Sequence, residues 1–143
     1  MAPFSSSTIA RYFIDKDKNT ERDTMKVLKL VYIAHGFHLA STGEPLIKEN
    51  VAAWQYGPVI PGLYFQLKTK QLQDNPIESI ELQNNVYLTQ FLDVIWEKYK
   101  KYTGFELSDL THKEGTPWDI TVRQFEGIIP SERIKNHYLQ LMN

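Results

Sequence analysis

The sequence predicts a mainly α-helical fold, a compact single-domain helical bundle with a small β-hairpin. Apolar residues recur at steps of three and four along most of the chain, which is the spacing of one face of a helix. The 143 residues include 42% hydrophobic residues, which is enough for one domain with its own core. No internal repeat and no low-complexity linker divides the chain, so we expect residues 1–143 to form one domain.

The N-terminal part is expected to contain a short helix, a loop and a long helix. Apolar residues at helical spacing predict the first helix over residues 8–15, and the polar run over residues 15–22 predicts a loop. Thr20 and Asp23 are spaced like a capping box, although the usual partner is Glu or Gln. We therefore expect the long helix over residues 21–40.

The long helix is expected to be buried at the centre of the bundle, because apolar residues cover more than half of its circumference. Gly36 costs roughly 1 kcal/mol relative to alanine, which predicts the close approach of another helix or an aromatic ring. Lys29 stands amid apolar residues, and we expect its ammonium to reach water or a carboxylate. One helix face carries residues that step by three and four: Met25, Leu28, Tyr32, His35 and Leu39.

A β-hairpin and a rigid corner are predicted next. Residues 45–54 have a polar centre at residues 48–50, which suits the turn of a two-stranded ribbon. Residues 56–61 form a rigid corner, because each proline fixes its own φ and restricts the residue before it. Pro61 is placed to be the first residue of a helix that ends near Lys70.

A polar connector is expected over residues 74–83, with a short strand at residues 77–82. Asn84 or Asn85 is suited to cap the helix that follows. The apolar stripe of that helix continues to about Tyr102.

Three shorter helices are predicted to complete the bundle. The first covers residues 105–113 and ends before Gly115. The second begins at residues 116–119, where a Thr cap precedes a Pro and an Asp. Pro130 opens the last helix.

Composition and charge argue against several functional classes. The formal net charge is −1, whereas a duplex nucleic-acid binder needs a basic face, so nucleic acid is not the expected partner. The absence of cysteine removes disulfides, thiolate metal sites and a Cys nucleophile. Residues 1–7 carry no basic residue, and no apolar run has the length of a membrane span. We therefore expect a cytoplasmic protein with no membrane partner.

Catalytic motifs are missing. The sequence has no phosphate loop, no GxGxxG fingerprint and no GxSxG elbow, so we expect neither an enzyme nor a cofactor. His35 and His38 lie three apart on one helix, but a zinc site would need further ligands. His35 also lies on the apolar face, so we expect a hydrogen-bonded core histidine and no metal.

His112 is the one histidine with a conceivable catalytic setting, since Asp109 and Ser108 or Thr111 are close to it. However, helix neighbours seldom place a nucleophile beside an oxyanion hole. The commoner role is to satisfy the last carbonyls of a helix, and partner contact is a third option.

Aromatic residues beside the rigid turns are candidates for contact with a partner. Aromatic residues mostly build cores, and we expect this of Trp54 and Trp118, but the same residue types dominate interface hot spots. Tyr56, in the Gly-Pro corner, is expected to be the most exposed. The full set of predicted partner-binding residues is Trp54, Tyr56, Pro58, Tyr64, His112 and Trp118.

Five groups of residues along the chain form recognisable motifs: Leu28–Tyr32 with Ala34, Gly36, Phe37 and Leu39, then Gly43–Leu46, Ala53–Pro61 with Tyr64, Leu107–His112 with Gly115, Pro117 and Trp118, and Ile129–Pro130 with Ile134 and Tyr138. These motifs resemble those of the Panacea domain, the SocA-like antitoxin family of phage-associated proteins. The resemblance extends from Met25 to Tyr138, with its motifs in the expected order.

The resemblance implies an antitoxin that neutralises a cognate toxin by direct binding. It also implies a second form of the activity, in which the antitoxin is an adaptor that presents the toxin to a protease or chaperone complex. It transfers no catalytic residue, cofactor or metal. The alternative is a nucleic-acid-associated or regulatory phage or prophage module without a toxin partner. The identity of the toxin and the oligomeric state stay open.

Overall fold

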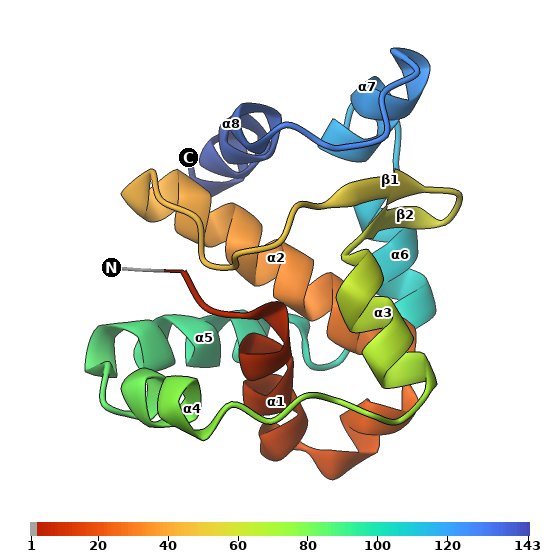
Figure 1. Ribbon diagram of the computed structural model, residues 1–143. Coiled ribbons are helices and arrows are strands. Elements are labelled where there is room, and N and C mark those ends of the chain that lie inside the picture. The colour runs from red at the N-terminus through yellow and green to blue at the C-terminus, as the bar shows by residue number, and fades with distance from the viewer. Residues whose placement is uncertain (1–2) are drawn as a thin grey trace.

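The computed structural model describes residues 3–143, and the long helix α2 passes through its middle (Figure 1). The neighbours of α2 include α1, the 3₁₀ helix that precedes α2, α3, α5, α6, α8 and the second strand of a small hairpin. In chain order the elements are α1 (Ser6–Lys16), the 3₁₀ helix η1 (Lys18–Arg22), α2 (Thr24–Thr42), β1 (Ala52–Trp54), β2 (Gly57–Val59), α3 (Pro61–Lys68), α4 (Pro76–Gln83), α5 (Val86–Tyr99), α6 (Gly104–Thr111), α7 (Pro117–Arg123) and α8 (Ser131–Met142).

The predicted helical bundle with one hairpin is confirmed, and so is the central burial of α2. Every residue from Val27 to Leu39 is buried. The helix begins later than predicted and is capped by Asp23, whose carboxylate accepts from Lys26 N at 3.1 Å. The predicted capping box that starts at Thr20 is wrong, because Thr20 is buried inside η1. Asp23 also accepts from Gly104 N at 2.8 Å, so one carboxylate binds the starts of two helices.

Gly36 allows an aromatic ring to contact the α2 backbone, as its position in the sequence predicted. A Cβ atom at Gly36 would lie 2.3 Å from both Cδ2 and Cε2 of Tyr138 on α8. The Tyr138 ring is buried and packs edge-on against Phe37, with 4.7 Å between the ring centroids. The missing side chain therefore decides where α8 docks on α2.

The hairpin lies further along the chain than predicted. Its strands pair antiparallel from Ala52 opposite Val59 to Trp54 opposite Gly57, and Gln55 and Tyr56 form the turn. Gly57 has φ 116°, a conformation that L side chains rarely adopt. The polar residues at 48–50 are not a hairpin turn, because the Glu49 side chain binds Ser6 and the Lys48 side chain pairs with Glu78 of α4.

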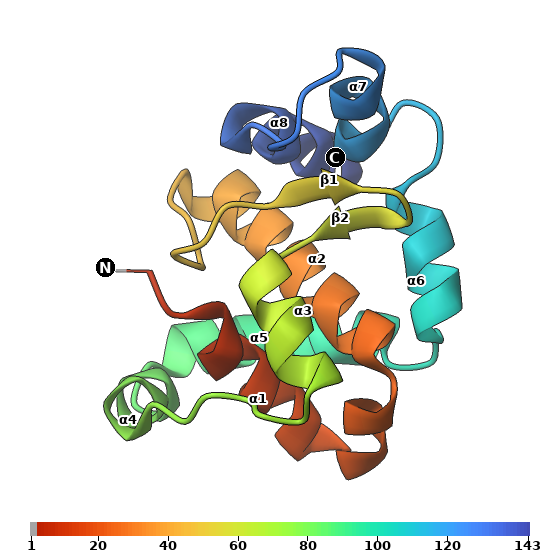
Figure 2. The same ribbon diagram turned by 45° about the vertical axis from the view of Figure 1, so that its right-hand side comes forward.

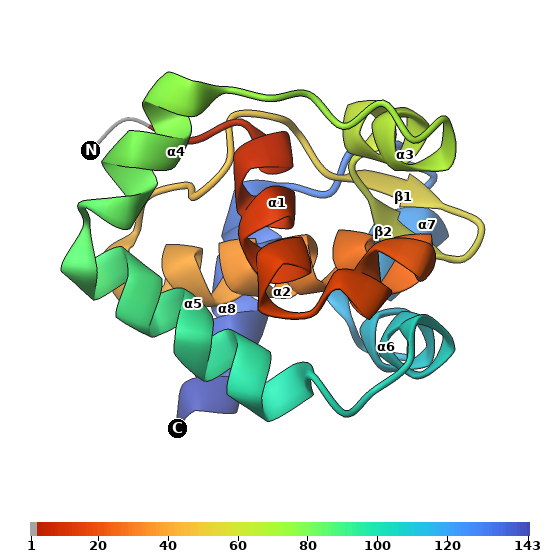
Figure 3. The ribbon, with the colours of Figure 1, turned by 90° about the horizontal axis from the view of Figure 1, so that it is seen from below.

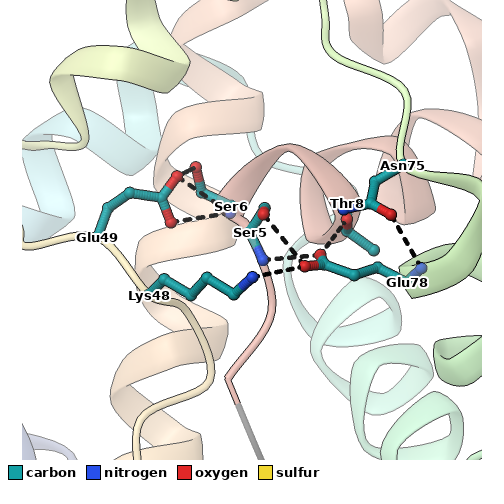
Figure 4. Close-up of polar contacts among 7 residues, drawn as sticks. All are labelled: Ser5, Ser6, Thr8, Lys48, Glu49, Asn75 and Glu78. Atoms are coloured by element: carbon teal, nitrogen blue, oxygen red, sulfur yellow. Dashed lines mark hydrogen bonds and ion pairs between the residues drawn. The ribbon is translucent and has the colours of Figure 1, made fainter.

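That binding cluster holds the start of α1 (Figure 4). Ser5 precedes α1 without a side-chain cap of its own. Instead, Glu49 accepts from Ser6 N at 3.0 Å, and Glu78 of α4 accepts from Ser5 N at 2.9 Å. Lys48 pairs with Glu78 at 2.8 Å. Carboxylates from distant segments thus satisfy the free N–H groups at the helix start.

The predicted connector with a strand at residues 77–82 is wrong, because this segment is helix α4. Asn75 caps α4 by accepting from Glu78 N at 3.1 Å, and Pro76 is its first residue. The helix buries only Glu78 and Leu82, so its apolar periodicity is weak. The signals in the sequence that could have predicted this helix were the cap residue Asn75 and the proline Pro76.

The remaining helices start where their caps predicted. Asn85 accepts from Leu88 N at the start of α5, and Thr116 accepts from Asp119 N at the start of α7. Pro61 opens α3 and Pro130 precedes α8. The predicted end of α5 near Tyr102 is wrong, since α5 ends at Tyr99. Within residues 3–143 no helix is both long and apolar enough to cross a bilayer.

Candidate partner-binding site

The hairpin brings the predicted partner-binding residues together from four parts of the chain. Figure 2 shows it beside α3, α6 and α7. The rings of Trp54 and Tyr64 meet edge to face with centroids 5.5 Å apart. Trp118 of α7 donates from Nε1 to the Trp54 carbonyl at 2.6 Å, and its ring lies 5.3 Å from that of His112. Segments far apart in the sequence therefore build one surface.

We call this surface the hairpin surface and define it by Trp54, Tyr56, Tyr64, Phe65 and Trp118. Tyr56 is 64% exposed, as predicted, and Phe65 is 56% exposed. Trp54 is 39% exposed, so the expectation that both tryptophans lie in the core is wrong for Trp54. Trp118 is half-buried and packs against the core. Phe65 was missed, although it directly follows Tyr64 in α3.

Three side chains from three helices bind the backbone of the hairpin. In addition to Trp118, Ser108 Oγ of α6 donates to the Tyr56 carbonyl at 2.6 Å. Lys29 Nζ of α2 donates to the Pro58 carbonyl at 2.5 Å. These bonds fix the turn before any partner arrives, which lowers the entropy that binding would cost. Pro58 itself is buried, so its side chain shapes the corner from beneath.

His112 ends α6 and binds the helix backbone. Its Nδ1 is hydrogen-bonded to the Ser108 carbonyl, which is the structural role that the sequence favoured. The Ser108 hydroxyl is occupied by the Tyr56 carbonyl. The hydroxyl and the imidazole thus bind different groups and do not form a nucleophile–base pair.

The two histidines of α2 are also bound to backbone groups. His35 Nδ1 accepts from Leu46 N at 3.3 Å and from Ile47 N at 3.4 Å, which confirms a hydrogen-bonded core histidine. Burial, helped by the nearby His38, lowers the pKa of His35 to about 4. His38 Nδ1 lies 2.7 Å from the Glu44 carbonyl. In the part of the chain that the structure describes, no group of three or more His, Asp or Glu side chains is arranged to hold a metal ion.

A cavity of about 520 Å³ opens beside the hairpin and was not predicted from the sequence. It lies between the N-terminal half of α2, the hairpin and α3. Lys29 is in its wall and is only 3% exposed. The predicted partner of Lys29, water or a carboxylate, is instead the Pro58 carbonyl. Burial lowers the pKa of Lys29 to about 8.

Comparison with known proteins places this chain in a family. The family model described as "Antitoxin SocA-like, Panacea domain" matches residues 27–119. The chain belongs to this family. The resemblance noted in its motifs is therefore confirmed.

The matched part of the Panacea domain contains the whole hairpin surface and the cavity-lining Lys29. It leaves out α1 and α8, which both pack on α2. Antitoxin SocA of Caulobacter vibrioides (strain NA1000 / CB15N) is 24% identical over 104 residues, which are 64% of this chain and 55% of that protein. The chain thus spans about half the length of this curated relative. No solved structure matches this chain significantly.

Proposed function

We propose that this Panacea domain is an antitoxin that binds a cognate toxin directly through the hairpin surface, without a catalytic step of its own. The observation that carries the proposal is the exposed aromatic cluster around a hairpin whose carbonyls are held by Trp118, Ser108 and Lys29. Exposed Trp and Tyr side chains on a rigid support are the typical anchors of protein interfaces. Membership of the SocA-like antitoxin family supports the toxin as partner.

The proposed mechanism is steric. A stable interface of standard size buries about 1,600 Å² in total, so a toxin seated on the hairpin surface would also contact the neighbouring α3 and α7. In this complex the antitoxin blocks the active or target-binding face of the toxin. Presentation of the bound toxin to a protease is a second form of the proposal, since binding and presentation use the same complex.

Co-expression with the product of the adjacent gene tests the proposal. Rescue of growth together with co-purification of a stable complex would support direct neutralisation. A shortened half-life of the toxin in protease-competent cells only would support presentation. A harmless neighbour that does not bind would contradict the antitoxin role and favour a regulatory module.

We expect Tyr56→Ala to weaken the complex by about 30-fold, because a central interface tyrosine contributes about 2 kcal/mol or more. The domain should keep its thermal transition, since Tyr56 is 64% exposed. Titration calorimetry with the purified partner measures the loss.

Tyr87→Ala is the matched control. Tyr87 is 88% exposed at the start of α5, next to α4. Figure 3 shows α4 at the opposite end of the molecule from the hairpin. An equal loss of affinity in both variants, or none in Tyr56→Ala, would remove the hairpin surface from the interface.

A further inference from the structure

We propose that the cavity beside the hairpin binds a carboxylate that a protein partner carries next to an apolar side chain. Lys29 supplies the positive charge, and the aromatic and aliphatic walls take the apolar group. The inference rests on the proposed function, because the cavity opens within the hairpin surface and would receive part of the same partner.

The size and walls of the cavity suit an inserted side chain. Its volume of about 520 Å³ lies in the range of ligand sites in proteins, about 300–1,000 Å³. Apolar side chains from three elements form most of the wall: Met25 and Leu28 of α2, Trp54 and Val59 of the hairpin, and Tyr64 of α3. An apolar side chain that enters would be covered on several sides.

The ammonium group of Lys29 lacks a negative partner. Its one acceptor is the Pro58 carbonyl, and within residues 3–143 no carboxylate oxygen lies within 4.0 Å of it. An ammonium has three N–H donors, so the Pro58 bond uses only part of its capacity. A buried charge is costly unless it is paired. Its lowered pKa of about 8, caused by burial, expresses that cost and still leaves the group largely protonated at neutral pH.

The charges around the cavity favour a carboxylate over other ligands. Lys29 is the only charged residue among those that line it, and the others are Thr24, Met25, Leu28, Trp54, Gln55, Tyr56, Gly57, Val59 and Tyr64. A cationic group would meet the ammonium without any acid to offset it. A phosphate is usually bound by several cations or by a row of backbone N–H groups, which one lysine does not replace. One carboxylate matches one ammonium.

The competing explanation is that Lys29 only fastens α2 to the hairpin through Pro58. That role predicts no preference of the cavity for anions. A small probe on the isolated chain separates the two explanations and needs no toxin.

The experiment titrates the ¹⁵N-labelled full chain with 3-phenylpropionate, with its neutral amide and with 3-phenylpropylamine. We expect saturable chemical-shift changes at Gly57, Tyr64 and the Trp54 indole. The affinity for the carboxylate should exceed that for the amide by about 10-fold, which corresponds to the contribution of one charge-assisted hydrogen bond. The amine should not bind. Equal binding of the carboxylate and the amide would overturn the proposal.

Two variants test the role of the charge. Lys29→Met keeps the aliphatic stem and should abolish the preference for the carboxylate over the amide. Thr24→Asp places an acid in the same cavity wall at the first residue of α2, where a negative charge is tolerated, and Thr24→Asn is its neutral control. We expect Asp, and not Asn, to lower carboxylate affinity. Because Thr24→Asp leaves Lys29 in place, the test survives if Lys29→Met fails to fold.

A final arm links the cavity to the partner. A folded Lys29→Met variant should bind the purified partner with about 10-fold lower affinity than the native chain. Probe binding with unchanged partner affinity would overturn the assignment of the carboxylate to the partner. If the native chain fails to rescue cells from the toxin but still prefers the carboxylate probe over the amide, the result would contradict the proposed function and leave the cavity as a carboxylate site.

Discussion

Replacing Gly36 with alanine is expected to lower the free energy of unfolding by about 3 kcal/mol, the upper part of the usual range for overpacking a core. The added Cβ would lie 2.3 Å from two carbon atoms of the Tyr138 ring. The ring cannot rotate away cheaply, because Phe37 and Tyr32 pack edge-on against it and it is buried. Displacement of α8 from α2 is the remaining way to relieve the clash.

Denaturant unfolding followed by circular dichroism measures this effect, with Gly62→Ala as the matched control. Gly62 is also in a helix, α3, but a Cβ there would meet nothing within 4 Å. Alanine should therefore be neutral or slightly stabilising at Gly62, by up to about 1 kcal/mol. Adding Tyr138→Leu to Gly36→Ala should recover part of the loss. Equal effects at both glycines would refute the contact as the cause.

Replacing Glu78 with glutamine is expected to cost about 2 kcal/mol near pH 7, the scale of hydrogen bonds to a charged group. The Glu78 carboxylate accepts from Ser5 N, from Thr8 Oγ1 at 2.7 Å and from Lys48 at 2.8 Å (Figure 4). Glutamine keeps the size of the side chain but loses the charge that holds these three groups. The start of α1 should then detach from α4 more readily.

The loss should depend on pH in a defined direction. Burial alone raises the pKa of Glu78, but the hydrogen bonds from Lys48, Thr8 and Ser5 outweigh it and hold the pKa at about 2, below its ordinary value of 4.5. A depressed pKa means that this stabilisation is fully present above pH 4.5 and disappears as the pH falls towards 2.

Denaturant unfolding of the native chain and Glu78→Gln at pH 7 and at about pH 3 checks this expectation. The difference between them should shrink at the lower pH. Glu81→Gln, an exposed acid on the same helix, serves as the control and should change little at either pH. A difference that stays constant with pH would contradict the role of the Glu78 charge.

Local signals in the sequence determined much of the secondary structure. The caps at Asn85 and Thr116 and the proline at Pro61 each fixed the start of a helix, because a cap depends on residues within one turn. The continuous apolar run of α2 predicted its burial, and Gly36 predicted a close ring. The Panacea motifs predicted the family to which the chain belongs.

Where a distant segment decides the role of a residue, the sequence pattern was insufficient. Lys48 and Glu49 looked like a turn because their partners, Glu78 and Ser6, are far away in the sequence. Apolar spacing did not predict α4, because its apolar face is weak and the helix buries only Glu78 and Leu82.

The candidate site divides in the same way. Tyr56 could be predicted to be exposed, because the rigid Gly-Pro corner is a local property of the chain. The exposure of Trp54 and the cavity lined by Lys29 depend on how the hairpin docks against α2, α3 and α7. The sequence by itself determined most of the helices, the family and the aromatic candidates. Only the tertiary structure decided that Trp54 faces solvent and where the unpaired charge lies, because burial and pairing are properties of contacts between segments.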